Sequence, residues 1–215
     1  MTQVAAQGAL FISGVGYSVE PISRDAALPL ILQVHYARRQ PNIRNAFGLY
    51  LNGGLVGVCT FGIPPSSTLL LGVCGVDYAV HVIELNRLCL LNNIKNEASR
   101  LVGASLKMLG NKIVVSYADT AQDHLGVVYQ ATNAIYTGTS KPFKEIYIVG
   151  KEHLHHASHK GKTFEEMKAI HGEDSVGFRE RSIKHRYVFI TGSKQFKRHA
   201  RKALKYQVLP YPKAQ

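Results

Sequence analysis

Apolar positions in the first third of the chain predict a helix followed by a β-hairpin. Asp25 is expected to cap the helix. Its buried face is expected to consist of Leu28, Ile31, Leu32 and His35. Residues 47–51 and 55–61 flank the turn Asn52-Gly53-Gly54, which is typical of a hairpin. Residues 69–74 are expected to form a further strand.

From residue 82 onward the pattern alternates between strand and helix. Residues 82–91 are expected to form a strand, and residues 96–109 an amphipathic helix. A β-branched strand follows over 112–118, then a second helix over 125–136 and a strand over 145–149. This order predicts an α/β fold with a mixed central sheet flanked by helices.

The last third of the chain is more polar. A histidine-dense loop contains His153, His155, His156 and His159, whose spacing fits no common zinc pattern and favours a solvated loop. A strand is expected over 185–190 and a basic helix over 194–206. We therefore divide the chain into a catalytic core, residues 1–150, and a basic extension, residues 151–215, that packs on the core or continues it.

Composition narrows the class of partner. The chain has 215 residues, of which 46% are hydrophobic, enough for one compact core. Lys and Arg number 26 against 14 Asp and Glu, a net charge of +12. Residues 151–215 carry 15 of these cations and 6 of the acids, a net charge of +9. This excess favours a polyanionic partner, with nucleic acid ahead of an anionic membrane surface.

The basic helix carries a stripe of one charge sign. Six cations fall at i, i+3, i+4, i+7, i+8 and i+11, which is one helical face, and no acid interrupts them. These residues are Lys194, Lys197, Arg198, Arg201, Lys202 and Lys205. The stripe predicts contact with DNA phosphates, with a solvated face as the alternative. In that case DNA binding is expected around Arg38, Arg39 and Arg44.

The cysteines and the apolar segments predict a cytoplasmic protein. Cys59, Cys74 and Cys89 lie in apolar stretches, so we expect small core residues in a reducing compartment. Residues 1–10 lack a charged leader followed by an apolar run, and residues 69–76 are too few to span a bilayer. We therefore expect no membrane partner.

Polar residues gather where one strand ends and the next helix begins. Ser116 and Asp119 lie at the carboxyl end of the predicted strand, where ligands bind in open α/β sheets, and Tyr129 follows in the helix. Asp119 is suited to act as a base or ligand, and Tyr129 to donate a proton. A helix cap at Asp119 and a core position for Tyr129 are the alternatives.

Two further motifs suggest anion binding. Arg87 alternates with apolar residues along its strand, so it is expected to pair with Asp119 or with an anionic ligand. Arg100, Gly103 and Ser105 lie in a helix that follows a strand, an arrangement that can hold a pyrophosphate. A surface arginine and a packing glycine would explain this second motif equally well.

Several of these segments resemble one family. His35-Tyr36, the run Glu-Leu-Asn-Arg-Leu over 84–88, and Ser-Tyr-Ala-Asp over 116–119 with Val-Tyr-Gln-Ala-Thr-Asn over 128–133 are similar to the Mom family of bacteriophage DNA-modification proteins. That family is related to GNAT-type N-acyltransferases. The resemblance covers residues 30–150. It implies a GNAT-like fold and the conversion of adenine in DNA to an N6-carbamoylmethyl derivative, which protects DNA from restriction.

The resemblance also implies roles for single residues. Asp119 would be the base or a ligand, Tyr129 the proton donor or an anchor for the donor group, and Arg87 an anion clamp. Ser116 would orient the donor, with His35 and Tyr36 at the mouth of the site. Iron would be held by His35, Tyr36 and Asp119, whose nitrogen and oxygen atoms suit that metal. An acyl-CoA donor would use Arg100, Gly103 and Ser105.

The expected partner is double-stranded DNA, from which the target base must be flipped. Two other functions stay open. One is an ordinary N-acetyltransferase that acts on a protein or a small amine. The other is a non-catalytic DNA-binding protein on a GNAT-like scaffold. The sequence leaves the oligomeric state open, a homodimer included.

Overall fold

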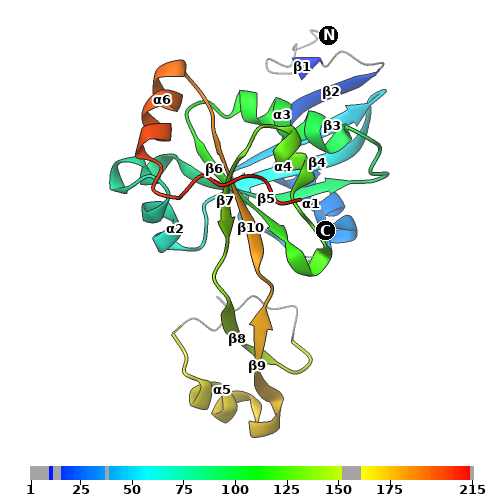
Figure 1. Ribbon diagram of the computed structural model, residues 1–215. Coiled ribbons are helices and arrows are strands. Elements are labelled where there is room, and N and C mark those ends of the chain that lie inside the picture. Colours follow the sequence, from blue (N-terminus) through cyan, green and yellow to red (C-terminus); the bar gives the residue numbers. More distant parts are fainter. Residues whose placement is uncertain (1–9, 12–15, 37–38, 152–160, 214–215) are drawn as a thin grey trace.

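Eight strands form one mixed sheet in the computed structural model, which describes residues 10–11, 16–36, 39–151 and 161–213 (Figure 1). The strands are β1 (Leu10–Phe11), β2 (Tyr17–Ile22), β3 (Asn45–Leu51), β4 (Gly54–Gly62), β5 (Val82–Leu90), β6 (Ile113–Asp119), β7 (Ile135–Thr139) and β10 (Lys184–Ile190). Their order is β1-β2-β3-β4-β5-β6-β10-β7. β5 and β6 are parallel, and the other neighbouring strands of this sheet are antiparallel.

Helices cover both faces of this sheet. On one face α3 (Glu97–Met108) and α4 (Val127–Ala131) bury Leu101 and Tyr129 against the strands. On the other face lie α1 (Arg24–Val34), α2 (Ser67–Gly72) and α6 (Lys194–Ala203). Alternation along β6 divides the two layers, because Val114 belongs to the first cluster and Val115 to the second. The predicted α/β fold, a mixed sheet flanked by helices, is confirmed.

Helix α1 begins earlier than the sequence pattern predicted. Its N-cap is Ser23, whose side chain accepts a hydrogen bond from the Ala26 amide at 3.1 Å, and Asp25 lies inside the first turn. The buried residues of α1 are Ala27, Leu30 and Ile31. Leu32 is 44% exposed, so the predicted inward face was wrong. The local spacing fits more than one face, and packing on β3 and β4 selects among them.

Two other predicted elements were wrong. Residues 69–74 were expected to form a strand, but α2 begins after Ser66, which caps the Leu69 amide, and buries Leu69 and Val73 one turn apart. A short apolar run is compatible with either state. The helix expected over 125–136 is only α4, because Asn133 has a positive φ and the chain continues into β7.

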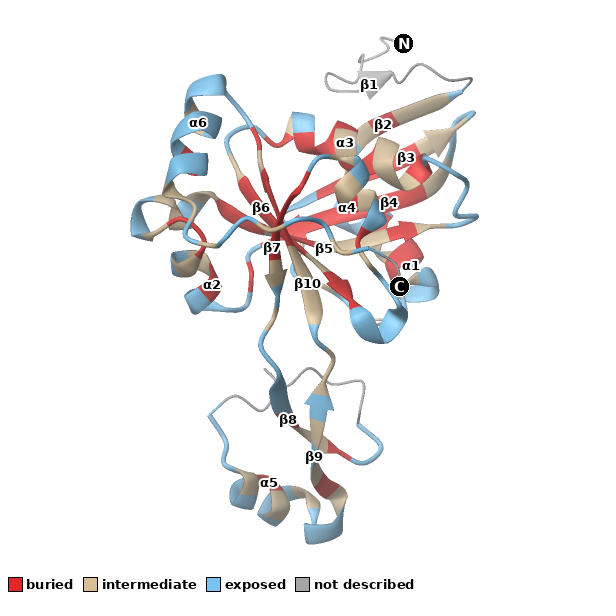
Figure 2. Ribbon diagram, in the orientation of Figure 1, coloured by how far each residue is buried: buried red, intermediate tan, exposed pale blue. Residues whose placement is uncertain are grey.

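The tail of the chain returns into the middle of the sheet. β10 pairs antiparallel with β6 from Lys184↔Asp119 to Ile190↔Ile113, and its other edge pairs with β7. Tyr187 is fully buried between them. The predicted strand over 185–190 is therefore confirmed as a central strand. Figure 2 shows buried residues concentrated in the central strands of the large sheet.

Residues between β7 and β10 form a projection that we call the arm (Figure 1). It consists of β8 (Phe143–Ile148) and β9 (Val176–Arg181), which pair with each other, and of α5 (Phe164–His171). Ile148, Met167 and Val176 make its small core. The strand predicted over 145–149 thus lies in the arm and not in the central sheet. The histidine-dense loop over 153–159 lies outside the described residues.

Two simpler expectations can be compared with the fold directly. Cys59, Cys74 and Cys89 are buried and form no disulfide, as predicted for core residues. In the part of the chain that the structure describes, every helix is too short or too polar to cross a bilayer.

Candidate active site

A cavity opens where the parallel strands separate. β5 and β6 pair only from Val82↔Ile113 to Leu85↔Ser116. Beyond that point β5 continues to Leu90 and β6 to Asp119 without further pairing between them. The cavity, which we call the pocket, measures about 600 Å³, a volume typical of ligand sites. Five predicted site residues line it: His35, Tyr36, Arg87, Asp119 and Tyr129.

A β-bulge at Asn86 turns β5 at the edge of the pocket. The pairing with β4 skips Asn86, so the residues after it change face. Leu85 therefore packs with the α3 layer, whereas Cys89 packs with the α1 layer. The sequence pattern placed Arg87 on one face with Leu85 and Cys89. The pairs Thr60↔Arg87 and Val58↔Cys89 keep Arg87 with Cys89, but Leu85 lies on the other face because simple alternation ignores the bulge.

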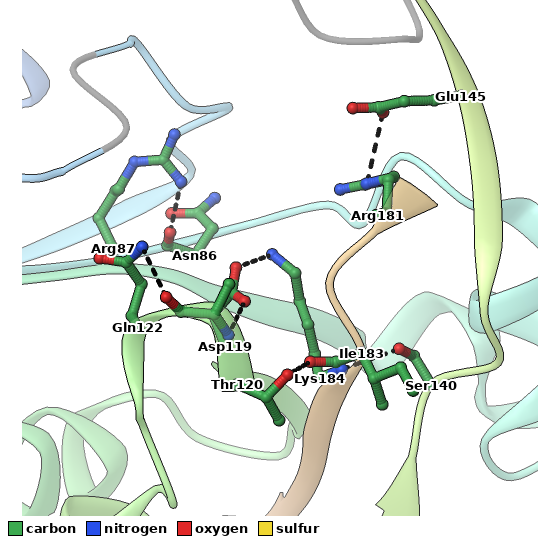
Figure 3. Close-up of polar contacts among 11 residues, drawn as sticks. Asn86, Arg87, Asp119, Thr120, Gln122, Ser140, Glu145, Arg181, Ile183 and Lys184 are labelled. Carbon is green, nitrogen blue, oxygen red and sulfur yellow. Dashed lines mark hydrogen bonds and ion pairs between the residues drawn. The ribbon is translucent and has the colours of Figure 1, made fainter. Parts of the chain in front are cut away.

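Arg87 is held by backbone carbonyls. Its Nη1 atom donates to the Asn86 oxygen at 2.6 Å (Figure 3). Its Nη2 atom donates to the Arg39 oxygen at 3.2 Å, while Nε is buried without a partner among the described residues. Burial and the charge of Arg39 hold the pKa of Arg87 below its ordinary value. The predicted ion pair with Asp119 is absent among the described residues, because another cation occupies that carboxylate. Arg87 thus lines the pocket without a carboxylate partner among the described residues.

Asp119 is fixed by groups on two sides. Its Oδ2 atom pairs with Lys184 Nζ at 2.8 Å, and its Oδ1 atom accepts from the Ala121 amide at 3.1 Å (Figure 3). Burial alone would raise the pKa of Asp119, but hydrogen bonds from Lys184 and Ser182 outweigh it, and the pKa lies below its ordinary value. Asp119 is therefore a carboxylate at neutral pH. It also caps the short 3-10 helix Thr120–Gln122, the structural role offered as the alternative.

Lys184 is the site residue that sequence reasoning missed. It is paired with Asp119 across the β10–β6 ladder although 65 residues separate them in sequence. Its backbone is held in turn by Ser140, whose amide donates to the Lys184 oxygen at 2.8 Å. The sequence pattern indicated a strand here but carried no signal for its register. The only sign of Lys184 in the sequence is that a basic residue directly precedes the strand predicted over 185–190.

Tyr129 places a protonated phenol beside the pocket. It is 8% exposed and packs against the rings of Tyr187 and Phe189. Burial raises the pKa of Tyr129 to about 12, and a hydrogen bond with Ser116 opposes the rise. The Ser116 hydroxyl also donates to the Leu85 carbonyl at 3.3 Å. Tyr129 is thus both a core residue and a group able to donate a proton at neutral pH.

His35 and Tyr36 lie together at the end of α1. Their rings stack with centroids 4.3 Å apart, and Tyr36 is 55% exposed. Burial, together with the charges of Arg87 and Arg39, lowers the pKa of His35 to about 4. His35 is therefore neutral at neutral pH, the form in which an imidazole accepts a hydrogen bond or binds a metal.

The sequence matches the Mom protein family over residues 16–213. The chain belongs to the Mom family. A relative in Escherichia phage Mu, named methylcarbamoylase mom, is 30% identical over 225 residues, covering 93% of this chain and 87% of that protein.

Among solved structures, an N-acetyltransferase from Staphylococcus aureus Mu50 has a TM-score of 0.46 at 13% identity, covering 81% of this chain and 98% of its own. The ribosomal-protein-S18-alanine N-acetyltransferase from Escherichia coli has a TM-score of 0.47 at 9% identity, covering 82% of this chain and 95% of its own.

The residues predicted to bind an acyl-CoA donor in this Mom-family chain are positioned for packing. Ser105 is fully buried, and its hydroxyl donates to the Leu101 carbonyl at 2.7 Å within α3. Gly103 faces Thr132 at an ordinary packing distance. Arg100 lies over the ring of Tyr17, with the guanidinium carbon 5.3 Å from its centroid. Arg100, Gly103 and Ser105 therefore do not form a pyrophosphate cradle.

The first turn of α3 already contains a buried anion. Glu97 is 2% exposed and accepts hydrogen bonds from the Tyr17 hydroxyl at 2.9 Å and the Ile94 amide at 3.1 Å. A helix N-terminus favours one negative group, and here the protein supplies it. A pyrophosphate at this turn would meet the Glu97 carboxylate, so this helix end does not fit acyl-CoA.

The predicted iron ligands share one cavity. His35, Tyr36 and Asp119 all line the pocket and offer a neutral imidazole, a phenol and a carboxylate, a donor set of the type that binds iron. Within the described ranges, no three His, Cys, Asp or Glu side chains converge as a metal-binding group, so the phenol is needed for a third ligand. The nitrogen and oxygen atoms of these three side chains therefore fit iron. In this structure the Asp119 carboxylate is paired with Lys184.

Proposed function

We propose that this Mom-family protein converts adenine in double-stranded DNA to its N6-carbamoylmethyl derivative and so protects the DNA from restriction. One observation carries the proposal: the fold brings three segments, distant in sequence and singled out by their resemblance to the family, to one pocket. These contain His35 and Tyr36, then Arg87, then Asp119 and Tyr129. The name of the phage Mu relative supports the same chemistry.

The chemistry of the acceptor amine determines which groups the pocket must provide. The exocyclic amine of adenine is conjugated with its ring and is a weak nucleophile, so positioning and proton removal matter most. As N6 forms its bond to a carbon of the donor, the bond from that carbon to the leaving group breaks, and the Asp119 carboxylate takes the proton that N6 loses. The Tyr129 phenol donates a hydrogen bond or a proton to the leaving group of the donor. Ser116 was predicted to orient the donor, but it is fully buried and does not line the pocket, so its role is to orient that phenol.

Arg87 is suited to hold the group donor. Its charge faces the pocket without a carboxylate partner among the described residues, and one buried N–H remains unbonded. A carboxylate or phosphate on the donor would supply both the missing charge and the missing acceptor. Adenine enters the same pocket only when it leaves the duplex, which costs a few kcal/mol.

We also propose iron as the metal of this site, held by His35, Tyr36 and Asp119, a ligand role for Asp119 that is the alternative to its role as base. When bound, iron supplies a redox-active Lewis acid. We expect untagged protein to contain iron and His35→Ala to contain clearly less, as measured by elemental analysis. His124→Ala is the matched control, because His124 also lines the pocket but is not a proposed ligand. Equal iron in all three proteins would remove His35 from the ligand set.

The stripe on α6 is proposed to bind DNA phosphates. Five of its six cations lie in α6, whereas Lys205 follows the helix, which ends at Ala203 and not at the predicted residue 206 because Leu204 is extended. All six cations are exposed, while Ala200 is buried and Phe196 packs beneath the helix. Replacing Lys197, Arg198, Arg201 and Lys202 with glutamine is expected to flatten the slope of log affinity against log salt by roughly two to four units, since each phosphate contact contributes about 0.9. Binding to all sequences should weaken alike.

The control variant for the stripe has the same change in net charge as the stripe variant. Glutamine replaces four exposed lysines elsewhere: Lys95, Lys107, Lys144 and Lys162. Fluorescence anisotropy with duplex DNA should give this protein nearly the wild-type salt slope. If the two quadruple variants have the same slope, α6 faces solvent or another subunit.

Nucleoside mass spectrometry tests the function itself. DNA co-expressed with the protein is digested, and we expect a modified adenosine with the mass of the carbamoylmethyl derivative. Turnover of acetyl-CoA without DNA would instead indicate an ordinary N-acetyltransferase. Tight, salt-sensitive DNA binding without a covalent product would indicate a DNA-binding protein on the same scaffold. Either outcome would overturn the proposal.

A further inference from the structure

The arm has one covered face and one face that carries arginines and aromatic rings. Alternation along β8 sends Ile146 and Ile148 toward α5, and Phe143, Glu145 and Tyr147 to the opposite side. The antiparallel register adds two arginines of β9 to that opposite side. We name it the Arg–aromatic face and define it by Phe143, Tyr147, Arg179 and Arg181.

This face has an excess of positive charge. Glu145 pairs with both arginines, at 2.8 Å to Arg179 Nη2 and 3.4 Å to Arg181 Nε. Among the described residues of this face, one carboxylate thus faces two guanidinium groups. The side chain of Glu145 is 9% exposed, whereas those of Arg179 and Arg181 are 39% and 29% exposed. Phe143 is 52% exposed beside them. Cationic and aromatic groups therefore reach the same surface.

The Arg–aromatic face lies beside the pocket. β9 leads directly into Ser182 and Lys184, the residues that hold Asp119. In Figure 3 Arg181 and Arg87 lie on opposite sides of the Asp119–Lys184 pair. The backbone oxygen of Arg39 accepts a hydrogen bond from Arg87, and the pKa of Arg39 is lowered first by burial and then by the charge of Arg181.

A flipped base restricts where its strand can run. The base stays attached to its own sugar and phosphates, so the groups that hold those phosphates must stand at the mouth of the pocket. The α6 stripe is too far away, because α6 follows Ile190, which pairs with Ile113 at the other end of β6 from Asp119. Six residues of strand span roughly 20 Å, or about six base pairs of duplex.

We propose that the Arg–aromatic face binds the DNA strand on either side of the flipped adenine. Arg179 and Arg181 contact its phosphates, and Phe143 and Tyr147 stack on neighbouring bases that have lost their partners. Arginine and aromatic side chains together are the usual means of holding an unpaired strand. The inference rests on the proposed function, since it takes DNA as the substrate and the pocket as the place of reaction.

Matched variants on the two faces of the arm test this inference. We expect Arg181→Gln to lower the salt slope for DNA binding by about 0.7 to 0.9. Phe143→Ala should weaken binding to DNA with a mismatched target adenine by roughly five- to hundredfold, from the loss of one stacked base. Lys144→Gln removes a charge from the opposite face of the same strand and should bind as wild type does.

Modified nucleosides are measured on the same proteins. If DNA is bound and modified but Arg181→Gln and Phe143→Ala bind like Lys144→Gln, the inference is overturned and the proposed function stands. If the wild-type protein produces no modified adenine, the proposed function fails, whatever the arm variants do in the binding assay.

A second measurement uses the unaltered protein, so it does not depend on the folding of a variant. A duplex carries 5-iodouracil next to a mismatched target adenine, and the irradiated complex is mapped by peptide mass spectrometry. We expect crosslinks within β8 or β9. Crosslinks confined to α6 would contradict the inference.

Discussion

Asp119→Asn is expected to lower the rate of adenine modification by about 10²- to 10⁴-fold, the usual contribution of a general base. The asparagine keeps the volume of the side chain but cannot accept the proton from N6. The ion pair with Lys184 at 2.8 Å is lost as well, so we expect a decrease of about 1–3 kcal/mol in the free energy of unfolding. Single-turnover product formation and chemical denaturation measure the two effects separately.

Lys184→Met separates the chemical role of Asp119 from its structural role. This variant breaks the same ion pair and should lose a similar free energy of unfolding, but it keeps the carboxylate in the pocket. Its rate should therefore exceed that of Asp119→Asn by at least tenfold. Equal rates in the two variants would mean that Asp119 acts only by fixing the end of β6.

Tyr129→Phe is expected to lower the rate of modification by a similar factor, about 10²- to 10⁴-fold, with DNA affinity unchanged. The phenol is buried with a pKa of about 12, so it holds its proton at neutral pH and is able to give it up only to a strongly basic group formed during the reaction. Removing the hydroxyl leaves the packing against Tyr187 intact. Rate and affinity are measured on the same DNA duplex.

A second buried tyrosine serves as the control for Tyr129. Tyr136 belongs to the same aromatic cluster and bonds His185 Nδ1 at 2.9 Å, but it does not line the pocket. Tyr136→Phe and Tyr129→Phe each lose one neutral hydrogen bond, about 0.5–1.5 kcal/mol of stability. Only Tyr129→Phe should lose activity. A comparable loss in Tyr136→Phe would make the effect one of packing.

Much of the site could be predicted because its information is local. Asp119 ends a strand and Tyr129 lies in the next helix, so the sequence alone places both near one sheet edge. The α6 stripe is also local, since helical periodicity brings its cations from Lys194 to Lys202 to one face, and all six cations are exposed as expected. The family resemblance added His35 and Tyr36, whose sequence context is otherwise that of an ordinary helix end.

The remainder depends on contacts between distant segments. Lys184 reaches Asp119 only through the register of β10, which no pattern within that strand specifies. The bulge at Asn86 changes the face of Arg87, and a bulge adds one residue without a mark in the hydrophobic pattern. The arm separates from the central sheet although its first strand has the same alternation as a core strand.

The central position of β10 has a consequence for how the chain folds. β6 and β7 are synthesised before β10 but are joined to each other only through it. While residues 184–190 are absent, the edge of β6 at Val114 and Val115 is an unpaired apolar strand edge, open to pairing with other chains. The native sheet therefore closes only after almost the whole chain has been made, and a nascent chain that ends before residue 184 exposes an aggregation-prone edge.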